Sequence, residues 1–291
     1  MRFSRLSLFA FIITTVLIGT NCAYYNRIVG RKNLVDGANA YKNRKFADAE
    51  RLFREAVARD PEGATTEGRA AQLFLARTIH SEYIGNRKAN EKAEEAIREY
   101  QKVLRIDPKD QSSFKAVANL YENLGRNDEW QSWVTERANN EQIPPEQRSE
   151  ALTSLAAKKN TCANDISDTE ATKKTVTKDG KQVFEFVKPA NPADFEMLKQ
   201  CANEGEQLAR RAVEYDQNSD SAWSYLTSLL IQKMRVAEME GNKEEAARLK
   251  AESETAKEKF TALAEARRQK EQAEAEKKKA EEEAAAANKK K

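Results

Sequence analysis

Small and aromatic residues recur at helical spacing in three stretches of the 291-residue chain. Within a stretch, apolar positions three, four or seven residues apart fall on one face of an α-helix. A proline closes two of the stretches, where a helix is expected to end. The pattern predicts consecutive pairs of helices. The positions that carry it are Gly37, Tyr41, Phe46, Ala49, Phe53, Ala56 and Pro61; Leu75, Ala76, Ile79, Ala96, Tyr100, Val103 and Pro108; and Phe114, Val117, Ala118, Tyr121 and Gly125.

The first copy shows why each kind of residue suits a helix pair. Gly37 has no side chain, so that two helices can approach closely at this position. Ala49 and Ala56 lie seven residues apart on one helical face and leave room for a neighbouring helix, while Phe53 between them fills space. Pro61 lacks an N–H group and restricts the residue before it, which ends the second helix.

This spacing resembles that of the tetratricopeptide repeat family, whose unit of about 34 residues is a helix–turn–helix. The pattern Ala-x3-[Phe/Tyr]-x2-[Ala/Val]-x4-Pro occurs twice, from Ala49 to Pro61 and from Ala96 to Pro108. The resemblance implies an all-α solenoid of stacked helix pairs that presents a binding groove. The exported character of the chain, discussed below, suggests a bacterial exported or lipoprotein member of the family.

The pattern also predicts how the chain is divided. Repeat two carries extra residues between its helices, which predicts a longer turn there. Beyond repeat five the chain is almost entirely Glu, Lys, Ala, Arg and Gln, which predicts a solvated helical tail. The expected segments are 1–23, an export signal or membrane anchor; 24–144, repeats one to three, with 24–36 as a link or as the start of the first helix; 145–256, repeats four and five with an insert at about 160–191; and 257–291, the charged tail.

The insert reads as a β-hairpin rather than a helix. Residues 175–184 are rich in β-type side chains, and Asp179-Gly180 in the middle is a preferred two-residue type I′ turn. Asn191 followed by Pro192 is a plausible cap and first position of the next helix. The apolar side chains of Val183, Phe184, Phe186 and Val187 need a cover, either from neighbouring helices or from a partner.

The first 22 residues have the character of an export segment. Arg2 and Arg5 precede an apolar stretch from Leu6 to Gly19, which is shorter than the ~20 residues that span a bilayer comfortably. Cys22 lies where a bacterial lipoprotein carries its acylated cysteine, although Gly19 and Asn21 depart from that motif. Cleavage after Ala23, or an uncleaved anchor at residues 6–25, are the alternatives. Each places the rest of the chain outside the cytoplasm, and an anchored chain would face the periplasm.

Two further cysteines, Cys162 and Cys201, lie on either side of the predicted hairpin. A pair of cysteines in an exported chain favours a disulfide over a metal or redox site. The alternative is two free buried thiols. Without a CxxC motif, the single histidine, His80, cannot complete a zinc site with cysteines this far apart.

Charge and motifs exclude several classes of function. The 50 basic and 47 acidic residues are interspersed and give a formal net charge of +3. Nucleic-acid binding needs basic residues gathered on one face, so we expect no nucleic-acid partner. No nucleophile elbow, phosphate loop or HExxH motif is present. We therefore expect neither an enzyme nor a cofactor or metal, while catalysis by paired carboxylates, as in a glycosidase, stays open.

In the family that the chain resembles, first-helix residues line the groove. Lys115 and Asn119 also resemble half of a clamp for a peptide carboxylate, but Ser154 replaces the asparagine expected on the next first helix. Carried over by position, the groove residues are Tyr41, Lys42, Arg77, His80, Lys115, Asn119 and Glu122, with Ser228 and Gln232 in repeat five.

The sequence therefore predicts a protein-binding scaffold of the bacterial cell envelope that holds a protein or peptide partner in its groove, with an assembly factor as one such role. The alternative is a structural spacer in the periplasm that acts through its charged tail.

Overall fold

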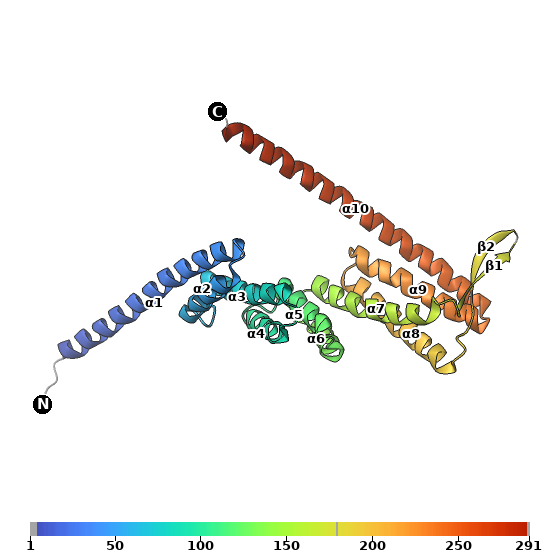
Figure 1. Ribbon diagram of the computed structural model, residues 1–291, viewed down its shortest axis with the longest axis horizontal. Coiled ribbons are helices and arrows are strands. Elements are labelled where there is room, and N and C mark those ends of the chain that lie inside the picture. Colours follow the sequence, from blue (N-terminus) through green and yellow to red (C-terminus); the bar gives the residue numbers. More distant parts are fainter. Residues whose placement is uncertain (1–4, 179, 290–291) are drawn as a thin grey trace. The chain divides into compact units, whose positions relative to one another are not determined.

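The computed structural model describes the backbone of residues 5–178 and 180–289 and the side chains of residues 24–177 and 180–283. Figure 1 shows a chain of helices joined by short turns, with one two-stranded sheet. The helices form two compact units, Met1–Trp130 (unit 1) and Gln131–Lys291 (unit 2).

Unit 1 consists of helix pairs in which each helix packs on the next. The pairs are built from α1 (Arg5–Lys42), α2 (Phe46–Arg59), α3 (Thr66–Gly85), α4 (Asn90–Ile106) and α5 (Gln111–Asn123). Helix α6 (Asn127–Asn139) begins in this unit. Helices α1 and α3, the first helices of repeats one and two, also contact each other, as expected when repeats stack side by side. The positions predicted to be buried in the second helices, Ala49, Phe53, Ala56, Ala96 and Tyr100, are buried.

The turn between the first two helix pairs is held by one carboxylate. Asp60 accepts hydrogen bonds from the backbone N–H groups of Ala64 (2.9 Å) and Thr65 (2.8 Å) and from the Thr65 hydroxyl (2.7 Å). Burial alone raises the pKa of Asp60, but these hydrogen bonds outweigh it and lower the pKa below its ordinary value. Thr65 in turn caps α3 by accepting from the N–H of Gly68 at 3.0 Å.

Residues 24–36, expected to link the export segment to repeat one or to start its first helix, belong to α1, which buries Gly30, Asn33 and Gly37 on one face. One expectation for unit 1 differs from the structure. The turn of repeat two is short, since only residues 86–89 separate α3 from α4. The extra residues lengthen the two helices instead, which lets their backbone groups hydrogen-bond within the helix.

Unit 2 contains α7 (Pro145–Ser167), β1 (Lys173–Lys178), β2 (Lys181–Phe186), α8 (Pro192–Tyr215), α9 (Asp220–Glu240) and α10 (Lys243–Lys289). Helix α7 packs on α8 and α9, α8 packs on α9, and α9 packs on α10. A cluster that includes Ala156, Ala209, Leu229, Leu230 and Leu249 forms the core between them. The predicted start of α8 is confirmed, because the Asn191 side chain accepts from the N–H of Ala193 at 3.1 Å.

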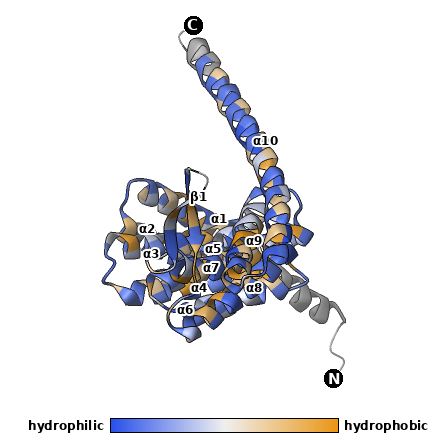
Figure 2. Cartoon of the chain, turned by 90° about the vertical axis from the view of Figure 1, so that its right-hand side faces the viewer, coloured by the Kyte–Doolittle hydropathy of each residue, from blue (hydrophilic) through white to orange (hydrophobic). Residues whose placement is uncertain are grey.

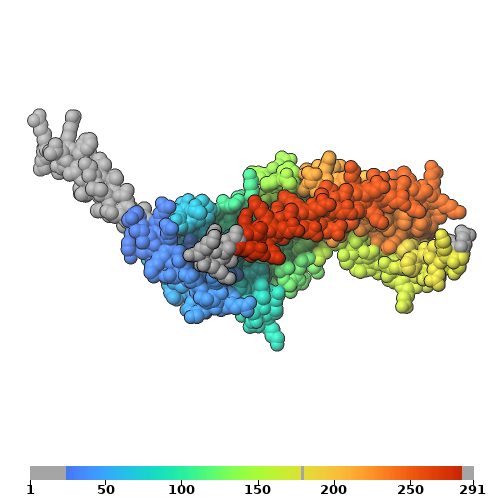
Figure 3. All heavy atoms as spheres, turned by 90° about the horizontal axis from the view of Figure 1, so that it is seen from above, coloured from blue at the N-terminus to red at the C-terminus, as the bar shows by residue number. Residues whose placement is uncertain are grey.

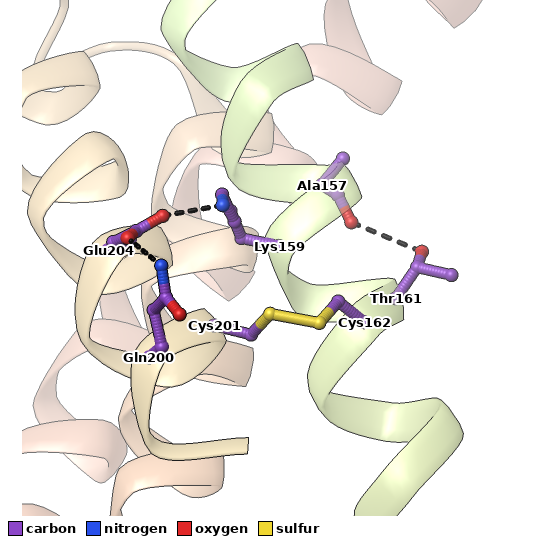
Figure 4. Close-up of a disulfide and its surroundings, with 7 residues drawn as sticks. All are labelled: Ala157, Lys159, Thr161, Cys162, Gln200, Cys201 and Glu204. Atoms are coloured by element: carbon purple, nitrogen blue, oxygen red, sulfur yellow. Dashed lines mark hydrogen bonds and ion pairs between the residues drawn. A yellow bond between two sulfur atoms is a disulfide. The ribbon is translucent and has the colours of Figure 1, made fainter. Parts of the chain in front are cut away.

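Cys162 and Cys201 form a disulfide between α7 and α8, with their Cα atoms 6.1 Å apart (Figure 4). Beside it, Lys159 on α7 and Glu204 on α8 form an ion pair of 2.5 Å. Residues 160–167, which we expected to belong to the insert, continue α7. They remain helical because Cys162, Ala163 and Ile166 share a face that packs with Phe195, Leu198 and Cys201. The insert therefore starts at residue 168.

The predicted hairpin is confirmed as a two-stranded antiparallel sheet. Its register pairs Lys178 with Lys181, so that residues 179 and 180 form the turn. Gly180 has a φ of +74°, as a primed turn requires. Asp179, the other predicted turn residue, lies outside the described residues.

The tail is helical, and α10 extends over 47 residues. Its first part packs on α9 through Leu249 and Ala256, whereas the side chains of residues 265–283 are exposed. Figure 2 shows the predominantly hydrophilic colouring of this outer part. Among the described residues, no helix combines the length and the apolar character needed to cross a membrane. The side chains of the predicted export segment, Cys22 included, lie outside the described part.

The predicted fold class is confirmed: an all-α solenoid of tetratricopeptide-like helix pairs that carries a small β-hairpin.

Candidate protein-binding surface

The predicted groove residue Tyr41 lies at the junction of α1 and α3. Its hydroxyl is 3.1 Å from the hydroxyl of Ser81 on α3. Its ring meets Phe46 edge-on at 5.5 Å and Phe74 edge-on at 6.3 Å, measured between ring centroids. Phe74 stacks in turn on the buried Phe53 at 5.5 Å. The hydroxyl of Tyr41 is therefore held in place by a ring that packs on Phe46 and Phe74.

Arg77 makes the corresponding connection from α3 to α5. Its guanidinium donates to the hydroxyl of Ser112 at 3.3 Å and lies 5.8 Å from the centre of the Phe74 ring. Ser112 also donates to Asp110, which caps α5 by accepting from the N–H of Ser113 at 2.6 Å. Burial raises the pKa of Asp110, but these hydrogen bonds and the charge of Arg77 hold it below its ordinary value. The three first helices are thus joined by polar contacts in one row.

His80 points toward the second helix of its own repeat. Its Nδ1 atom lies 3.3 Å from the hydroxyl of Tyr100 on α4, and the two rings meet edge-on. Burial, with a smaller effect from the charge of Arg87, lowers the pKa of His80 below its ordinary value. His80 is therefore neutral near pH 7, and it is better suited to hydrogen bonding than to attracting an anion.

The other predicted groove residues of unit 1, Lys42, Lys115, Asn119 and Glu122, are exposed. Lys115, Asn119 and Glu122 follow one another at helical spacing along α5, as the prediction requires. Asn119 accepts a hydrogen bond from the side chain of Asn123 at 2.8 Å. Ser154, which replaces the second clamp asparagine, donates to the carbonyl of Glu150 on its own helix. Of the carboxylate clamp, only the Lys115–Asn119 half is present.

Two exposed apolar side chains on the first helices were missed by the sequence prediction. Ile84 is 53% exposed and lies seven residues after Arg77, while Val35 is 52% exposed and lies seven residues before Lys42. A spacing of seven keeps each on the same helical face as its polar neighbour. We call this set the first-helix surface: Val35, Tyr41, Lys42, Arg77, His80, Ile84, Lys115, Asn119 and Glu122.

In unit 2, the expected groove residue Gln232 is buried instead, at 2% exposure. Its carbonyl oxygen accepts from the Ser167 hydroxyl at 2.8 Å, and its amide nitrogen donates to Asn164. These bonds tie α9 to α7, so Gln232 supports the packing of the helices. Ser228 donates to the carbonyl of Ser224 one turn earlier and is half-buried. The groove positions were transferred from the family that the chain resembles, and such a transfer does not show whether a side chain is buried in this chain.

A hollow in unit 2 lies beside the hairpin. It has a volume of about 460 Å³ and is bounded by Phe184, Glu185 and Phe186 of β2 and by Met234, Glu238, Gly241, Lys243, Ala246, Ala247 and Lys250 of α9 and α10. Figure 3 shows the hairpin, in yellow, next to the orange start of α10. Phe186 packs on the α7–α8 cluster and under Arg235 of α9, whose guanidinium lies 4.2 Å from the ring centre. Phe184 remains 61% exposed.

Within the described residues, no three His, Cys, Asp or Glu side chains are placed to hold a metal ion. No protein-family model and no curated protein matches the chain.

Three solved structures with similar helix arrangements are distant in sequence. Pseudomonas aeruginosa PilF is 12% identical, covers 77% of this chain and 90% of its own, and gives a TM-score of 0.38. YrrB, described as a TPR protein with an unusual peptide-binding site, is 11% identical over 86% of this chain and 97% of its own, with a TM-score of 0.39. A tetratricopeptide repeat protein from Parabacteroides merdae is 14% identical over 81% of this chain and 97% of its own, with a TM-score of 0.36. At these values the fold assignment rests on the helix pairs of the chain itself.

Proposed function

We propose that the chain is a non-enzymatic scaffold that binds a polypeptide partner along the first-helix surface of unit 1. The observation that carries the proposal is the row of polar contacts from Tyr41–Ser81 to Arg77–Ser112. These contacts fix side chains that offer hydrogen-bonding atoms, so these side chains lose less entropy when a partner binds them. The exposed Val35 and Ile84 beside them supply apolar area. Fixed polar groups next to apolar side chains suit an extended segment or a helix of another protein.

We further propose that this scaffold works at the bacterial cell envelope, tethered through its N-terminal segment and facing the periplasm. The sequence of residues 1–22, with a basic start and an apolar stretch ending near Cys22, supports this location. The disulfide between Cys162 and Cys201 is consistent with it, because disulfides persist in oxidising compartments. A tethered scaffold of this kind would serve the assembly of an envelope structure.

Site-specific photo-crosslinking in cells tests the binding surface. The photoreactive residue p-benzoylphenylalanine is placed at Ile84 on the first-helix surface and, as a control, at Arg98, which is exposed on the second helix α4. We expect one envelope protein to be captured from Ile84 and not from Arg98. Arg77→Gln should reduce this capture, whereas Arg98→Gln should leave it unchanged. Equal capture from both positions would reject the first-helix surface as the binding site.

A structural spacer is the second candidate, and the outer part of α10 favours it. Its side chains from 265 to 283 are exposed, and ion pairs such as Lys277–Glu281 at 4.0 Å support a solvated helix. Truncation after Arg267, which pairs with Asp220 of α9 at 3.0 Å, separates the two functions. In both cases the partner is still captured from Ile84. A scaffold keeps its role in the cell after the truncation, whereas a spacer loses it.

A further inference from the structure

The hydrogen-bond register of the hairpin determines which backbone groups face outward. The closing pair Lys178–Lys181 flanks a two-residue turn, and Val187 donates to the carbonyl of Thr172 at 2.8 Å. Hydrogen-bonded and non-hydrogen-bonded pairs alternate along an antiparallel ladder. The backbone N–H and C=O groups of the alternate residues of β2, Gln182, Phe184 and Phe186, therefore point away from β1.

The outer edge of β2 is open to solvent along most of its length. Every residue from Lys181 to Glu185 is exposed, and Val183 and Phe184 are exposed by 37% and 61%. Phe186, at the base, is half-buried under Arg235. A hollow of about 460 Å³ separates the consecutive residues Phe184, Glu185 and Phe186 from α9 and α10. An open strand edge with exposed apolar side chains is a site for pairing with another strand.

The charges of the hairpin favour pairing at the β2 edge, and pairing there with a second copy of β2. Three of the six residues of β1 are lysines, so two copies of β1 would repel each other. In β2, Lys181 and Glu185 have opposite charges and lie symmetrically about Val183. A second β2 running antiparallel, with Val183 opposite Val183, brings each lysine opposite a glutamate. The strand is therefore complementary in charge to itself.

We propose that β2 pairs with β2 of a second copy of this chain, in an antiparallel register centred on Val183. The outward backbone groups of Gln182 in each copy then exchange hydrogen bonds with the outward backbone groups of Phe184 in the other copy. The two Lys181–Glu185 pairs lie at the ends of the paired segment. The two Phe184 side chains become diagonal neighbours on one face of a four-stranded sheet, within reach of each other. This pairing is independent of the first-helix surface, which belongs to the other unit.

Cysteine crosslinking of the full-length chain in its native membranes tests the register. Residues opposite each other in a non-hydrogen-bonded antiparallel pair have Cα atoms about 4.5 Å apart, within the range of a disulfide. Val183→Cys should therefore give a covalent dimer of the chain on mild oxidation with copper phenanthroline. Val176→Cys is the matched control, because it lies opposite Val183 on β1 and is two strands farther from its equivalent in the dimer. The unsubstituted chain controls for the native cysteines.

We expect several-fold more covalent dimer from Val183→Cys than from Val176→Cys or the unsubstituted chain. In the Val183→Cys background, Lys181→Glu or Glu185→Lys alone should lower the dimer yield by roughly tenfold, because like charges then face each other twice. The exchange of both charges, Lys181→Glu with Glu185→Lys, should restore the yield. Equal yields from positions 183 and 176, an adduct with a different protein, or failure of the double exchange to restore the yield would each overturn the proposal.

Discussion

The ring of Phe53 on α2 occupies the space that a side chain at position 37 of α1 would need. A Cβ atom added at Gly37 would lie 2.8 Å from Cε1 and 2.9 Å from Cδ1 of Phe53. These distances are shorter than van der Waals contact, and the buried Phe53, stacked on Phe74, has little room to move. The absence of a side chain at position 37 is thus what allows the first helix pair to close.

We therefore expect Gly37→Ala to lower the free energy of unfolding by about 1–3 kcal/mol, the usual effect of overpacking a core. Chemical denaturation measures it. Gly85→Ala is the control, since a Cβ atom at Gly85 meets no atom within 4 Å. That substitution should be neutral or slightly stabilising. Equal stability of the two variants would contradict the close approach of α1 and α2.

Replacing one of two glutamates beside Lys92 by glutamine should reduce the free energy of unfolding, and replacing the other should not. Lys92 forms ion pairs with Glu50 (2.9 Å) and Glu82 (2.7 Å), and Arg54 pairs with Glu50 at 2.6 Å. Burial raises the pKa of Glu50, but the hydrogen bonds from Lys92 and Arg54 bring it below its ordinary value. Burial also raises the pKa of Glu82, and with the nearby Glu50 this outweighs Lys92, so that its pKa stays above the ordinary value.

Ionised Glu50 therefore stabilises the fold above its unfolded pKa of about 4.5, and this stability is lost as the pH falls through the folded pKa. For Glu82 the stabilising contribution is present below the unfolded pKa and is lost as the pH rises through the folded pKa. At pH 7, Glu50→Gln should reduce the free energy of unfolding by about 1 kcal/mol, and Glu82→Gln should not reduce it. Thermal unfolding from acid to neutral pH measures both, and destabilisation by both variants alike would refute the difference.

The single histidine of the chain makes its own pH dependence measurable. Because the pKa of His80 is lowered in the fold, the unfolded chain binds the proton more readily. The free energy of unfolding should therefore fall as the pH decreases through the unfolded pKa of about 6.5 and below. Relative to the native chain, His80→Gln should lose the part of the pH dependence between about pH 7.5 and 5.5 that belongs to the imidazole. A variant with the same slope as the native chain would show that His80 is not desolvated.

The disulfide should contribute measurably to the stability of unit 2. It links cysteines 39 positions apart, and the entropy of closing such a loop corresponds to about 4 kcal/mol. Replacing both Cys162 and Cys201 by alanine should lower the unfolding midpoint. A reducing agent should lower the midpoint of the native chain to a similar degree and leave that of the double variant unchanged. If the reducing agent also lowered the midpoint of the double variant, its effect on the native chain could not be assigned to this disulfide.

The repeat pattern predicted most of the fold, because each unit contains strong local signals. Pro61 and Pro108 marked the ends of second helices, and Asn191-Pro192 marked the start of α8. The end of α7 was missed, since Asn160 and Thr161 have weak helix propensity and read as part of the insert. Its helical state depends on tertiary packing, in which Cys162, Ala163 and Ile166 contact residues of α8.

The candidate surface was less accessible to sequence reasoning. Arg77 and Tyr41 were found by position, yet their partners Ser112 and Ser81 come from neighbouring helices and carry no sequence signal. Gln232 occupied an expected groove position and is buried, because its amide has partners on α7. Whether a polar side chain faces solvent or a neighbouring helix depends on residues far away in sequence.

The covalent bridge at the base of the hairpin also determines how the chain would respond to a protease. The hairpin is exposed and rich in lysine, whereas Cys162 and Cys201 lie on helices on either side of it. A cut between β1 and β2 would leave two fragments joined by sulfur, with the α7–α8 contact intact. Such a nicked molecule would migrate as one chain until it is reduced. The hairpin could thus be severed without the two parts of the solenoid separating.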